Sequence, residues 1–338
     1  MSGQERKHGG VLLLGGAGYI GTVLSRELLD AGYAVTAFDN LLYGHGFAVR
    51  HLLNHPNYRF VRGDIADRAA VADAVNGVSH VVLLAALVGD PICKKCPDLA
   101  RATNLDASTR LFDDLIGRGV ARFIFASTCS NYGLRGTDEP ADEDAALNPI
   151  SLYAETKVAM ERHILNNANI ADFAATILRF ATAFGFSPRM RFDLTISEFT
   201  RELALGNELT VYDEHTWRPY CHVIDIARAI LTVLEADENS IRGEVFNVGS
   251  AEENYTKKMI VGIAQENGVP GSVRYAEGGA DARNYRVSVE KFRSRFDFDT
   301  LHSVKGEVPK LIAAVRAGLF DDVEARRDAY GNYKIALQ

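Results

Sequence analysis

Cysteine is scarce in this sequence, whose 338 residues include only Cys93, Cys96, Cys129 and Cys221. Four cysteines do not make a disulfide framework in a chain of this length, so we expect free thiols. Cys93 and Cys96 form a Cys-x-x-Cys, but the sequence has no second such pair and no histidine at zinc-finger spacing. We therefore predict no metal site, and the intervening Lys94 and Lys95 favour an exposed loop.

Long apolar runs and a basic excess are missing as well. No stretch approaches the roughly 20 continuous apolar residues of a membrane-spanning helix, and no signal-peptide pattern is present. The formal net charge of -7 excludes the overall positive field typical of nucleic-acid-binding proteins. We expect a cytoplasmic protein that binds neither membranes nor nucleic acid and that meets anionic ligands with local arginine clusters.

Strands and helices alternate along the first half of the chain. Apolar runs predict parallel strands at 11–14, 33–38, 58–61, 80–86, 122–126 and 174–180. Residues between them show helical spacing, as at 101–117. This alternation is typical of an α/β fold with a Rossmann-type, doubly wound parallel sheet.

Beyond residue 180 the alternation loosens into shorter elements. Helices are predicted at 192–205, 224–235, 259–266 and 308–317, and strands at 209–212, 220–223 and 245–248. We therefore expect a disordered tail at 1–9, a larger domain at 10–180, a smaller interwoven α/β substrate lobe at 181–320, and a C-terminal tail at 321–338.

Glycines are concentrated where the first strand meets the first helix. Gly15, Gly18 and Gly21 follow the strand at 11–14, with Tyr19 and Ile20 between the last two. Glycines at this spacing let the backbone turn tightly, approach a pyrophosphate and pack the helix on its strand, while the helix N-terminus attracts phosphate. The domain at 10–180 is therefore predicted to bind a dinucleotide and to carry the catalytic residues.

The second strand is followed by Asp39 and Asn40. A carboxylate at this place accepts hydrogen bonds from an adenosine ribose and repels a 2′-phosphate. No arginine follows until Arg50. The predicted cofactor is therefore NAD rather than NADP, with Asp39 and Asn40 among its contacts.

Later strand ends and one helix supply further candidate cofactor contacts. Asp64 either meets the adenine amine, with Ile65 against the ring, or caps the next helix. The fourth strand ends in small residues that let a cofactor lie close. Asn104, on the helix predicted at 101–117, either binds backbone or water near the site or is simply a polar residue with its hydrogen bonds satisfied. These further candidates are Leu84, Ala85, Ala86 and Asn104.

Tyr153 and Lys157 lie four residues apart in a helix predicted to follow Pro149. One helical turn separates them, so the ammonium can stabilise a phenolate and support proton transfer near neutral pH. The spacing alone also fits a solvated helix face. Thr128 follows the strand at 122–126, at the sheet edge where open α/β folds hold ligands; it also fits a β-branched residue that ends a strand.

Arginines lie beside the predicted element ends of the second half. Guanidinium groups suit a bidentate grip on phosphate oxygens, although each one alone also fits a surface charge. Several converging arginines would suit a diphosphate in this acidic chain. The candidates are Arg179, Arg189, Arg191, Arg218, Arg283 and Arg286.

With these motifs in order, residues 10–320 resemble an extended short-chain dehydrogenase/reductase of the NAD-dependent nucleotide-sugar epimerase/dehydratase family. The resemblance implies that Thr128, Tyr153 and Lys157 form the catalytic triad and that Arg218 and Arg283 bind diphosphate. It also implies that a sugar hydroxyl, usually at the 4-position, is oxidised with hydride transfer to NAD. The implied substrate is a nucleotide-diphosphosugar, with GDP or UDP favoured, and the implied assembly is a homodimer formed through a four-helix bundle.

The catalytic loop departs from parts of this family. The 4,6-dehydratases carry Asp-Glu after the threonine, whereas Cys129 and Ser130 follow here and lack the acid–base pair that removes water. Dehydration is therefore not expected. Cys129 is one residue away from the cysteine of GDP-mannose 3,5-epimerases, which leaves its role open. Both residues are candidate substrate contacts, as is Tyr212, which by family position lies near the base or else belongs to the core.

Residues 85–93, 185–200 and 281–287 are similar to bacterial GDP-heptose 4-dehydrogenases, whose catalytic-loop asparagine is replaced here by Thr128. Thr182 stands where the 4-epimerases carry an asparagine. The net reaction therefore stays open between 4-epimerisation and release of a 4-keto sugar. One alternative is a 4-keto reductase that runs the triad in reverse. Another is a non-catalytic NAD-binding scaffold, which the intact triad disfavours.

Overall fold

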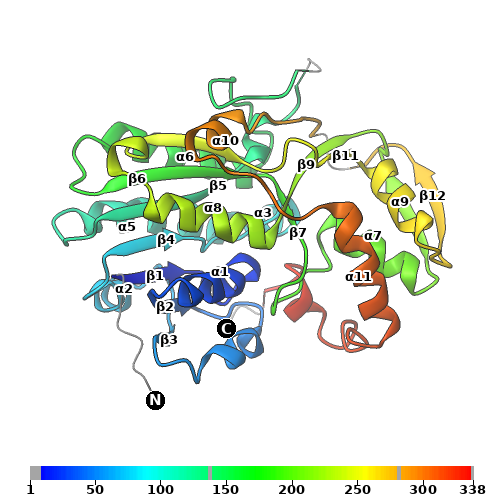
Figure 1. Ribbon diagram of the computed structural model, residues 1–338, viewed down its shortest axis with the longest axis horizontal. Helices are drawn as coiled ribbons and strands as arrows, with labels where there is room; N and C mark the ends of the chain where they lie inside the picture. The colour runs from blue at the N-terminus through cyan, green and yellow to red at the C-terminus, as the bar shows by residue number, and fades with distance from the viewer. Residues whose placement is uncertain (1–8, 136–138, 280–282, 336–338) are drawn as a thin grey trace.

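A seven-stranded sheet with helices on both faces organises the structure, a computed structural model that describes residues 9–135, 139–279 and 283–335 (Figure 1). All neighbouring strands in this sheet are parallel. The order across the sheet is β10 (Glu244–Val248), β6 (Ala174–Phe180), β5 (Arg122–Thr128), β4 (His80–Leu83), β1 (Gly10–Leu14), β2 (Ala34–Asp39) and β3 (Tyr58–Arg62). The predicted Rossmann-type fold is confirmed.

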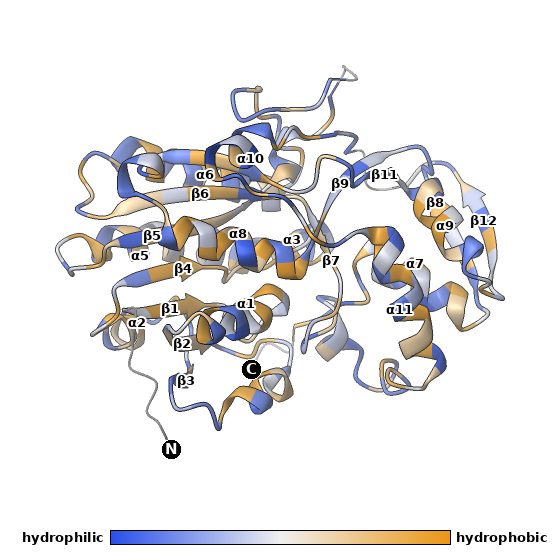
Figure 2. Cartoon of the chain, viewed as in Figure 1, coloured by the Kyte–Doolittle hydropathy of each residue, from blue (hydrophilic) through white to orange (hydrophobic). Residues whose placement is uncertain are grey.

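The inner strands form because their side chains are buried on both faces. In β1, Val11 and Leu13 belong to the core that includes α1 (Tyr19–Asp30) and α8 (Val223–Glu235). Leu12 and Leu14 belong to the opposite core, with α2 (Arg68–Val75), α5 (Ser108–Leu115) and α6 (Leu152–Asn167). Successive strand residues point to opposite faces, so a strand covered on both sides needs a continuous apolar run (Figure 2).

Polar side chains fix where the helices on the sheet begin. Ser151 Oγ accepts a hydrogen bond from the Ala154 amide at 3.3 Å and opens α6. Asp67 accepts from two amides in the first turn of α2, so Asp67 and not Asp64 is the cap of that helix. Asp64 instead accepts a hydrogen bond from Asn40 Nδ2 at 2.8 Å, which joins the ends of β2 and β3.

Two stretches between β4 and β5 differ from the predictions. The expected loop around Cys93 is the helix α3 (Asp90–Lys95), and Cys93 is fully buried. The helix expected at 101–117 is α4 (Pro97–Arg101), a π-helical turn (Ala102–Ala107) and then α5. β4 ends at Leu83, earlier than expected, because the next two amides, of Leu84 and Ala85, both donate to the Leu14 carbonyl.

The smaller lobe is interwoven with the sheet. It contains a three-stranded sheet of β11 (Asn254–Thr256), β9 (Trp217–His222) and β7 (Thr182–Phe184), and a two-stranded sheet of β12 (Ser272–Ala276) and β8 (Glu208–Tyr212). Its helices are α7 (Thr195–Ala204), α9 (Lys257–Glu266) and α11 (Val304–Arg316). Between α7 and α9 the chain returns to the central sheet, where it forms α8 and then β10 (Figure 1). The later helix α10 (Glu290–Phe296) packs on β10.

The segment 321–335, expected to be a tail, is packed against the protein. The Tyr330 ring lies 6.1 Å from that of Phe192 and 6.4 Å from that of Phe320, centroid to centroid. Ile335 is buried among loops at the carboxyl ends of the strands. Within the described ranges, no helix has the length and apolar character needed to cross a membrane.

Candidate active site

The glycine turn after β1 packs closely against the loop after β4 and leaves the start of α1 uncapped. Gly15 has a φ of +89°, and a Cβ there would lie 2.7 Å from the Ala85 amide nitrogen. Gly18 is the N-cap of α1 and makes no side-chain cap. The amides of the first helical turn therefore face outward without an internal side-chain acceptor, as a phosphate site requires.

Asp39 is held beside this turn. One carboxylate oxygen accepts a hydrogen bond from the Ala17 amide at 3.1 Å and the other from the Leu41 amide at 2.8 Å. His45 Nε2 lies 3.4 Å from the same carboxylate. The structure thus orients Asp39 at the carboxyl end of β2, next to the predicted pyrophosphate site.

Asn104 fixes the loop that follows β4. Its Oδ1 accepts from the Leu87 amide at 2.7 Å, and its Nδ2 donates to the Leu87 carbonyl at 3.0 Å. The π-helical turn brings this side chain inward, where it is buried. The Asn104 side chain is thus satisfied by the backbone of Leu87, and its contact with the cofactor stays a prediction.

The three residues predicted to be catalytic converge at the end of β5. Lys157 Nζ donates to the Ala126 carbonyl at 2.7 Å, and it lies 5.9 Å from the centroid of the Tyr153 ring. Thr128 ends β5, and its Oγ1 accepts a hydrogen bond from the Ser130 amide at 3.1 Å. This bond uses the acceptor side of the hydroxyl and leaves its hydrogen available for a ligand.

Burial opposes charge on both members of the Tyr153–Lys157 pair. It raises the pKa of the Tyr153 phenol well above its usual value, an effect that the nearby Arg191 and Arg283 partly offset. Burial lowers the pKa of the Lys157 ammonium to about 8. In the protein without ligands, Tyr153 is therefore a protonated phenol at neutral pH, and Lys157 can give up its proton more readily than a surface lysine.

A buried ion pair lies under the catalytic loop. Arg179 on β6 donates to both carboxylate oxygens of Glu161, which lies one turn after Lys157 on α6, with a shortest distance of 2.8 Å. Glu161 also accepts hydrogen bonds from Ser127 and from Asn131 on either side of the loop. Arg179, a candidate phosphate ligand by sequence, is thus a structural residue.

Arg218 and Arg283 lie together at the other side of the loop. Arg283 Nη1 donates to Ser130 Oγ at 3.0 Å, and its Nη2 lies 3.2 Å from Asp90 Oδ2. Arg218 donates to the Arg283 carbonyl and stacks over the Tyr285 ring, 5.5 Å from its centroid. The structure thus joins the two arginines predicted to bind diphosphate to the loop that carries Thr128.

The remaining arginine candidates fall into different environments. Arg191 pairs with Asp193 through two hydrogen bonds of 2.9 and 2.5 Å. Arg189 donates to Asn332 Oδ1 at 2.8 Å. Arg286 lies over the Trp217 ring, 5.2 Å from its centroid.

Cys129 does not face the site as a substrate contact would. Its side chain is fully buried, and Sγ donates to the Arg179 carbonyl at 3.1 Å. Burial raises its pKa, so the thiol is inert. Tyr212, the candidate base contact, ends β8 and is 47% exposed. It therefore lies at the surface of the smaller lobe rather than in its core.

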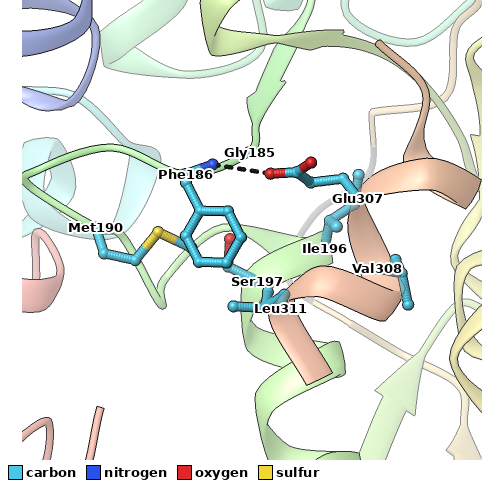
Figure 3. A pocket seen from close by; sticks show the side chains of 8 residues that line it. All are labelled: Gly185, Phe186, Met190, Ile196, Ser197, Glu307, Val308 and Leu311. Atoms are coloured by element: carbon cyan, nitrogen blue, oxygen red, sulfur yellow. Dashed lines mark hydrogen bonds between the residues drawn. The ribbon is translucent and has the colours of Figure 1, made fainter. Parts of the chain in front are cut away.

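The turn at residues 185–187 joins the two lobes. It was not predicted, because no sequence motif marks it. Tyr19 Oη donates to the Gly185 carbonyl at 2.5 Å, and Ser187 Oγ donates to the Tyr19 carbonyl at 2.7 Å. The same turn lines a pocket in which Glu307 accepts a hydrogen bond from the Phe186 amide at 3.2 Å (Figure 3). The first helix of the larger domain and the smaller lobe are thus held together at the N-terminal end of α1.

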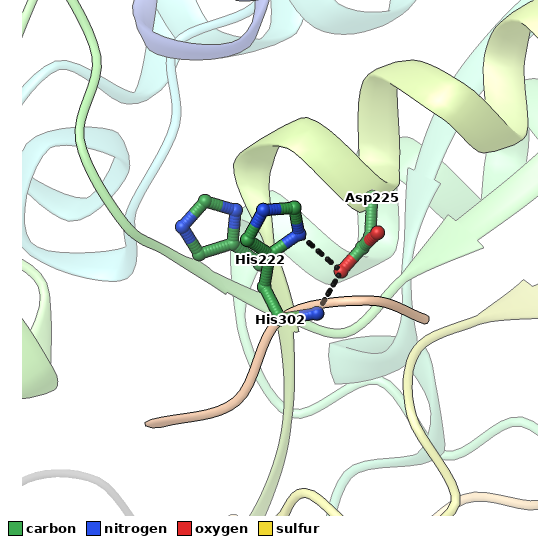
Figure 4. A group of neighbouring side chains, drawn as sticks. All are labelled: His222, Asp225 and His302. Atoms are coloured by element: carbon green, nitrogen blue, oxygen red, sulfur yellow. Dashed lines mark hydrogen bonds and ion pairs between the residues drawn. The ribbon is translucent and has the colours of Figure 1, made fainter. Parts of the chain in front are cut away.

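A second polar group, His222, Asp225 and His302, lies behind the turn at the start of α8 (Figure 4). The imidazole rings stack with centroids 4.3 Å apart, and His222 Nδ1 accepts from the Ile224 amide. Asp225 accepts from the amides of Leu301 and His302. The histidine rings stack on each other and the Asp225 carboxylate is engaged by backbone amides. This group therefore connects α8 to the segment before α11.

Comparison with known proteins agrees with this geometry. The model of the NAD dependent epimerase/dehydratase family matches residues 11–249. The chain is 29% identical to the UDP-glucose 4-epimerase of Corynebacterium glutamicum over 311 residues, 87% of this chain and 91% of that protein. The structure of MoeE5 in complex with UDP-glucuronic acid and NAD has a TM-score of 0.80 at 28% identity, and covers 92% of this chain and 100% of that one. The UDP-glucose 4-epimerase of Thermus thermophilus in complex with NAD has a TM-score of 0.78 at 25% identity, over 90% and 98% of the two chains.

The fold, the glycine turn and the Tyr153–Lys157 pair define an extended short-chain dehydrogenase/reductase. Within that class, the chain belongs to the NAD-dependent epimerase/dehydratase family. The expectation of NAD as cofactor is confirmed at the level of this family. The expectation of a nucleotide-sugar enzyme is supported in the same general form.

Removing Glu161 should strongly destabilise the protein. In Glu161→Ala the Arg179 guanidinium stays buried without its partner, which typically costs about 3–5 kcal/mol. The matched control is Asp30→Ala, which breaks the exposed Arg26–Asp30 pair and should cost less than about 1 kcal/mol. Urea unfolding followed by circular dichroism measures both, and equal losses would contradict the role given to the buried pair.

Lys157 should make stability depend on pH above neutrality. Its pKa is about 8 in the folded protein and 10.5 in the unfolded chain, so the unfolded chain binds more protons between these values. The free energy of unfolding therefore gains a contribution as pH rises through this range, and Lys157→Met lacks that gain. Urea unfolding of NAD-free protein between these pH values should show it, with the exposed Lys305→Met following the wild type. Parallel profiles for both variants would refute the assignment.

Proposed function

We propose that the protein oxidises the 4-hydroxyl of a nucleotide-diphosphosugar by hydride transfer to NAD. The product is either the 4-epimer or a 4-keto sugar. The observation that supports this most strongly is that Lys157 contacts the end of β5, with Tyr153 one turn away on α6 and Thr128 as the last residue of β5. They lie at the same carboxyl edge of the parallel sheet as the glycine turn after β1. Open α/β sheets hold their ligands at this edge.

The residues present fit a dinucleotide. Gly18 leaves the N-terminus of α1 without a side-chain cap, which suits a pyrophosphate, and Asp39 is oriented for a ribose. Lys157 lies where it can hold the nicotinamide ribose. NAD, when bound, supplies the hydride acceptor for the carbon that carries the reacting hydroxyl.

The protein itself moves the proton. Tyr153 Oη accepts the proton of the sugar hydroxyl as the hydride leaves the same carbon, so that a ketone forms. The Lys157 ammonium favours the phenolate that this step needs, against the burial that raises the pKa of Tyr153. Thr128 orients the sugar hydroxyl by donating the hydrogen that its bond to Ser130 leaves unused.

The arginine pair supports a diphosphate-linked substrate. Arg283 lies between Ser130 and Asp90, and Arg218 is bonded to its carbonyl, so two guanidinium groups lie at one side of the catalytic loop. Such groups suit phosphate oxygens. The ligands named for the related structures are UDP-sugars, which favours UDP over GDP as the nucleotide.

Dehydration is not part of the proposal. Removal of water from the sugar needs an acid–base pair, and the two positions after Thr128 hold the buried thiol of Cys129 and the hydroxyl of Ser130.

We also propose a homodimer formed through a four-helix bundle that includes α6. The exposed Leu165 on α6 and Ile170 beyond it support this arrangement.

Tyr153→Phe should separate chemistry from binding. Loss of the proton acceptor should lower turnover by about 10²–10⁴-fold while NAD binding is retained. The matched control is Tyr275→Phe on β12, whose ring is partly exposed. Turnover is measured with UDP-, GDP-, dTDP- and CDP-sugars by detection of the epimer, the ketone and NADH, and thermal stabilisation by the same panel identifies the nucleotide.

The panel also distinguishes the alternatives. Consumption of NADH with a 4-keto sugar and silence with hydroxyl sugars would make the protein a reductase. A wild type that binds NAD but turns over neither kind of sugar would be a scaffold.

A further inference from the structure

Residues 330–335 cross the carboxyl edge of the sheet and join loops from both lobes. The Tyr330 carbonyl accepts from the Phe192 amide at 2.7 Å, and the Asn332 amide donates to Asp193 Oδ2 at 3.1 Å. Asn332 Nδ2 donates to the Val88 carbonyl, in the loop after β4, at 2.9 Å. We call these residues the 330–335 segment.

Asn332 also holds a buried arginine. Its Oδ1 accepts from Arg189 Nη2 at 2.8 Å, and the Gly331 carbonyl accepts from the same nitrogen at 3.3 Å. The guanidinium stacks on Tyr43, 4.9 Å from the ring centroid. Within the part of the chain that the structure describes, Arg189 Nε and Tyr43 Oη are buried and make no hydrogen bond. These two buried donors are available to a polar ligand.

Ile335 extends the segment to the catalytic tyrosine. It is buried in a cluster with Tyr43 and Leu87, against which Tyr153 packs. Tyr43 lies in the loop after β2, four residues beyond Asp39, and Leu87 lies in the loop after β4 that Asn104 fixes. The segment therefore contacts both loops that border the predicted cofactor site.

We propose that Asn332 and Ile335 are positioning residues of the cofactor site, and that the 330–335 segment retains NAD between turnovers. Asn332 holds Arg189 over Tyr43, whose hydroxyl and the Arg189 Nε keep donors that a dinucleotide can use, and Ile335 packs the loops together beside Tyr153. Cofactor can leave only after these contacts separate. The inference rests on the proposed function in taking this edge of the sheet as the NAD site. A cofactor that stays bound keeps the hydride available for return to the sugar, which favours epimerisation over release of a ketone.

The test compares a chain that ends at Tyr330 with Asn332→Ala, Ile335→Ala and the control Lys334→Ala, whose side chain is exposed. The probes are the NAD content of the purified proteins after acid release, and the rate at which bound NADH is displaced by excess NAD, followed by fluorescence. Asn332→Ala should release NADH about tenfold faster, as expected when a hydrogen bond to a charged group is lost. The shortened chain should release it faster still, and Lys334→Ala should match the wild type.

Release rates equal to the wild type in all variants would overturn the proposal. A shortened chain with higher turnover and unchanged NADH release would also overturn it, because the 330–335 segment would then block the active site rather than retain the cofactor. Circular dichroism confirms folding, and the two single substitutions keep the test valid if the shortened chain unfolds. The release measurement needs no sugar. A wild type that retains NAD but turns over no nucleotide sugar would refute only the proposed function, whereas a wild type that binds no NAD refutes both.

Discussion

The ion pair between Arg179 and Glu161 is the interaction on which the site most depends. Two charges are removed from water at the meeting point of β5, β6 and α6, and such burial is tolerated only when every polar atom finds a partner. Ser127 and Asn131 complete the set of partners for Glu161. The same contacts therefore satisfy the buried charges and fix the loop that follows Thr128. Glu161 lies one helical turn after Lys157, so the pair also anchors the helix that carries the lysine.

Burial also sets the chemical character of the reacting groups. Lys157 is buried at the end of β5 with its ammonium over the Phe125 ring, which lowers its pKa. Burial also raises the pKa of the Tyr153 phenol, which packs against the cluster of Tyr43, Leu87 and Ile335. Both shifts oppose charge in the absence of ligands. Burial of these ionisable groups lowers the stability of the folded protein. The apolar clusters on the two faces of the sheet compensate for that loss.

The features that follow local rules could be predicted from the sequence, and those that depend on distant partners could not. β6 was predicted with its observed bounds because a short, mostly apolar stretch is typical of a strand that is covered on both faces. The glycine turn was predicted because Gly15 needs a positive φ. An arginine looks the same in sequence whether it faces phosphate or a buried carboxylate, so Arg179 was placed among the ligands. Cys93 was placed in a loop because its neighbours are lysines, and Asn332 was missed because its partners lie more than a hundred residues away.

The hydrogen bond from Tyr19 to the Gly185 carbonyl has a consequence for how ligands bind. Its donor lies in the first turn of α1, and its acceptor lies in the chain that leads into the smaller lobe. Whatever orders one partner favours the ordered state of the other, and thermodynamic reciprocity requires the effect to be equal in both directions. A ligand that orders the first turn of α1 is therefore expected to favour the ordered form of the chain around Gly185 as well.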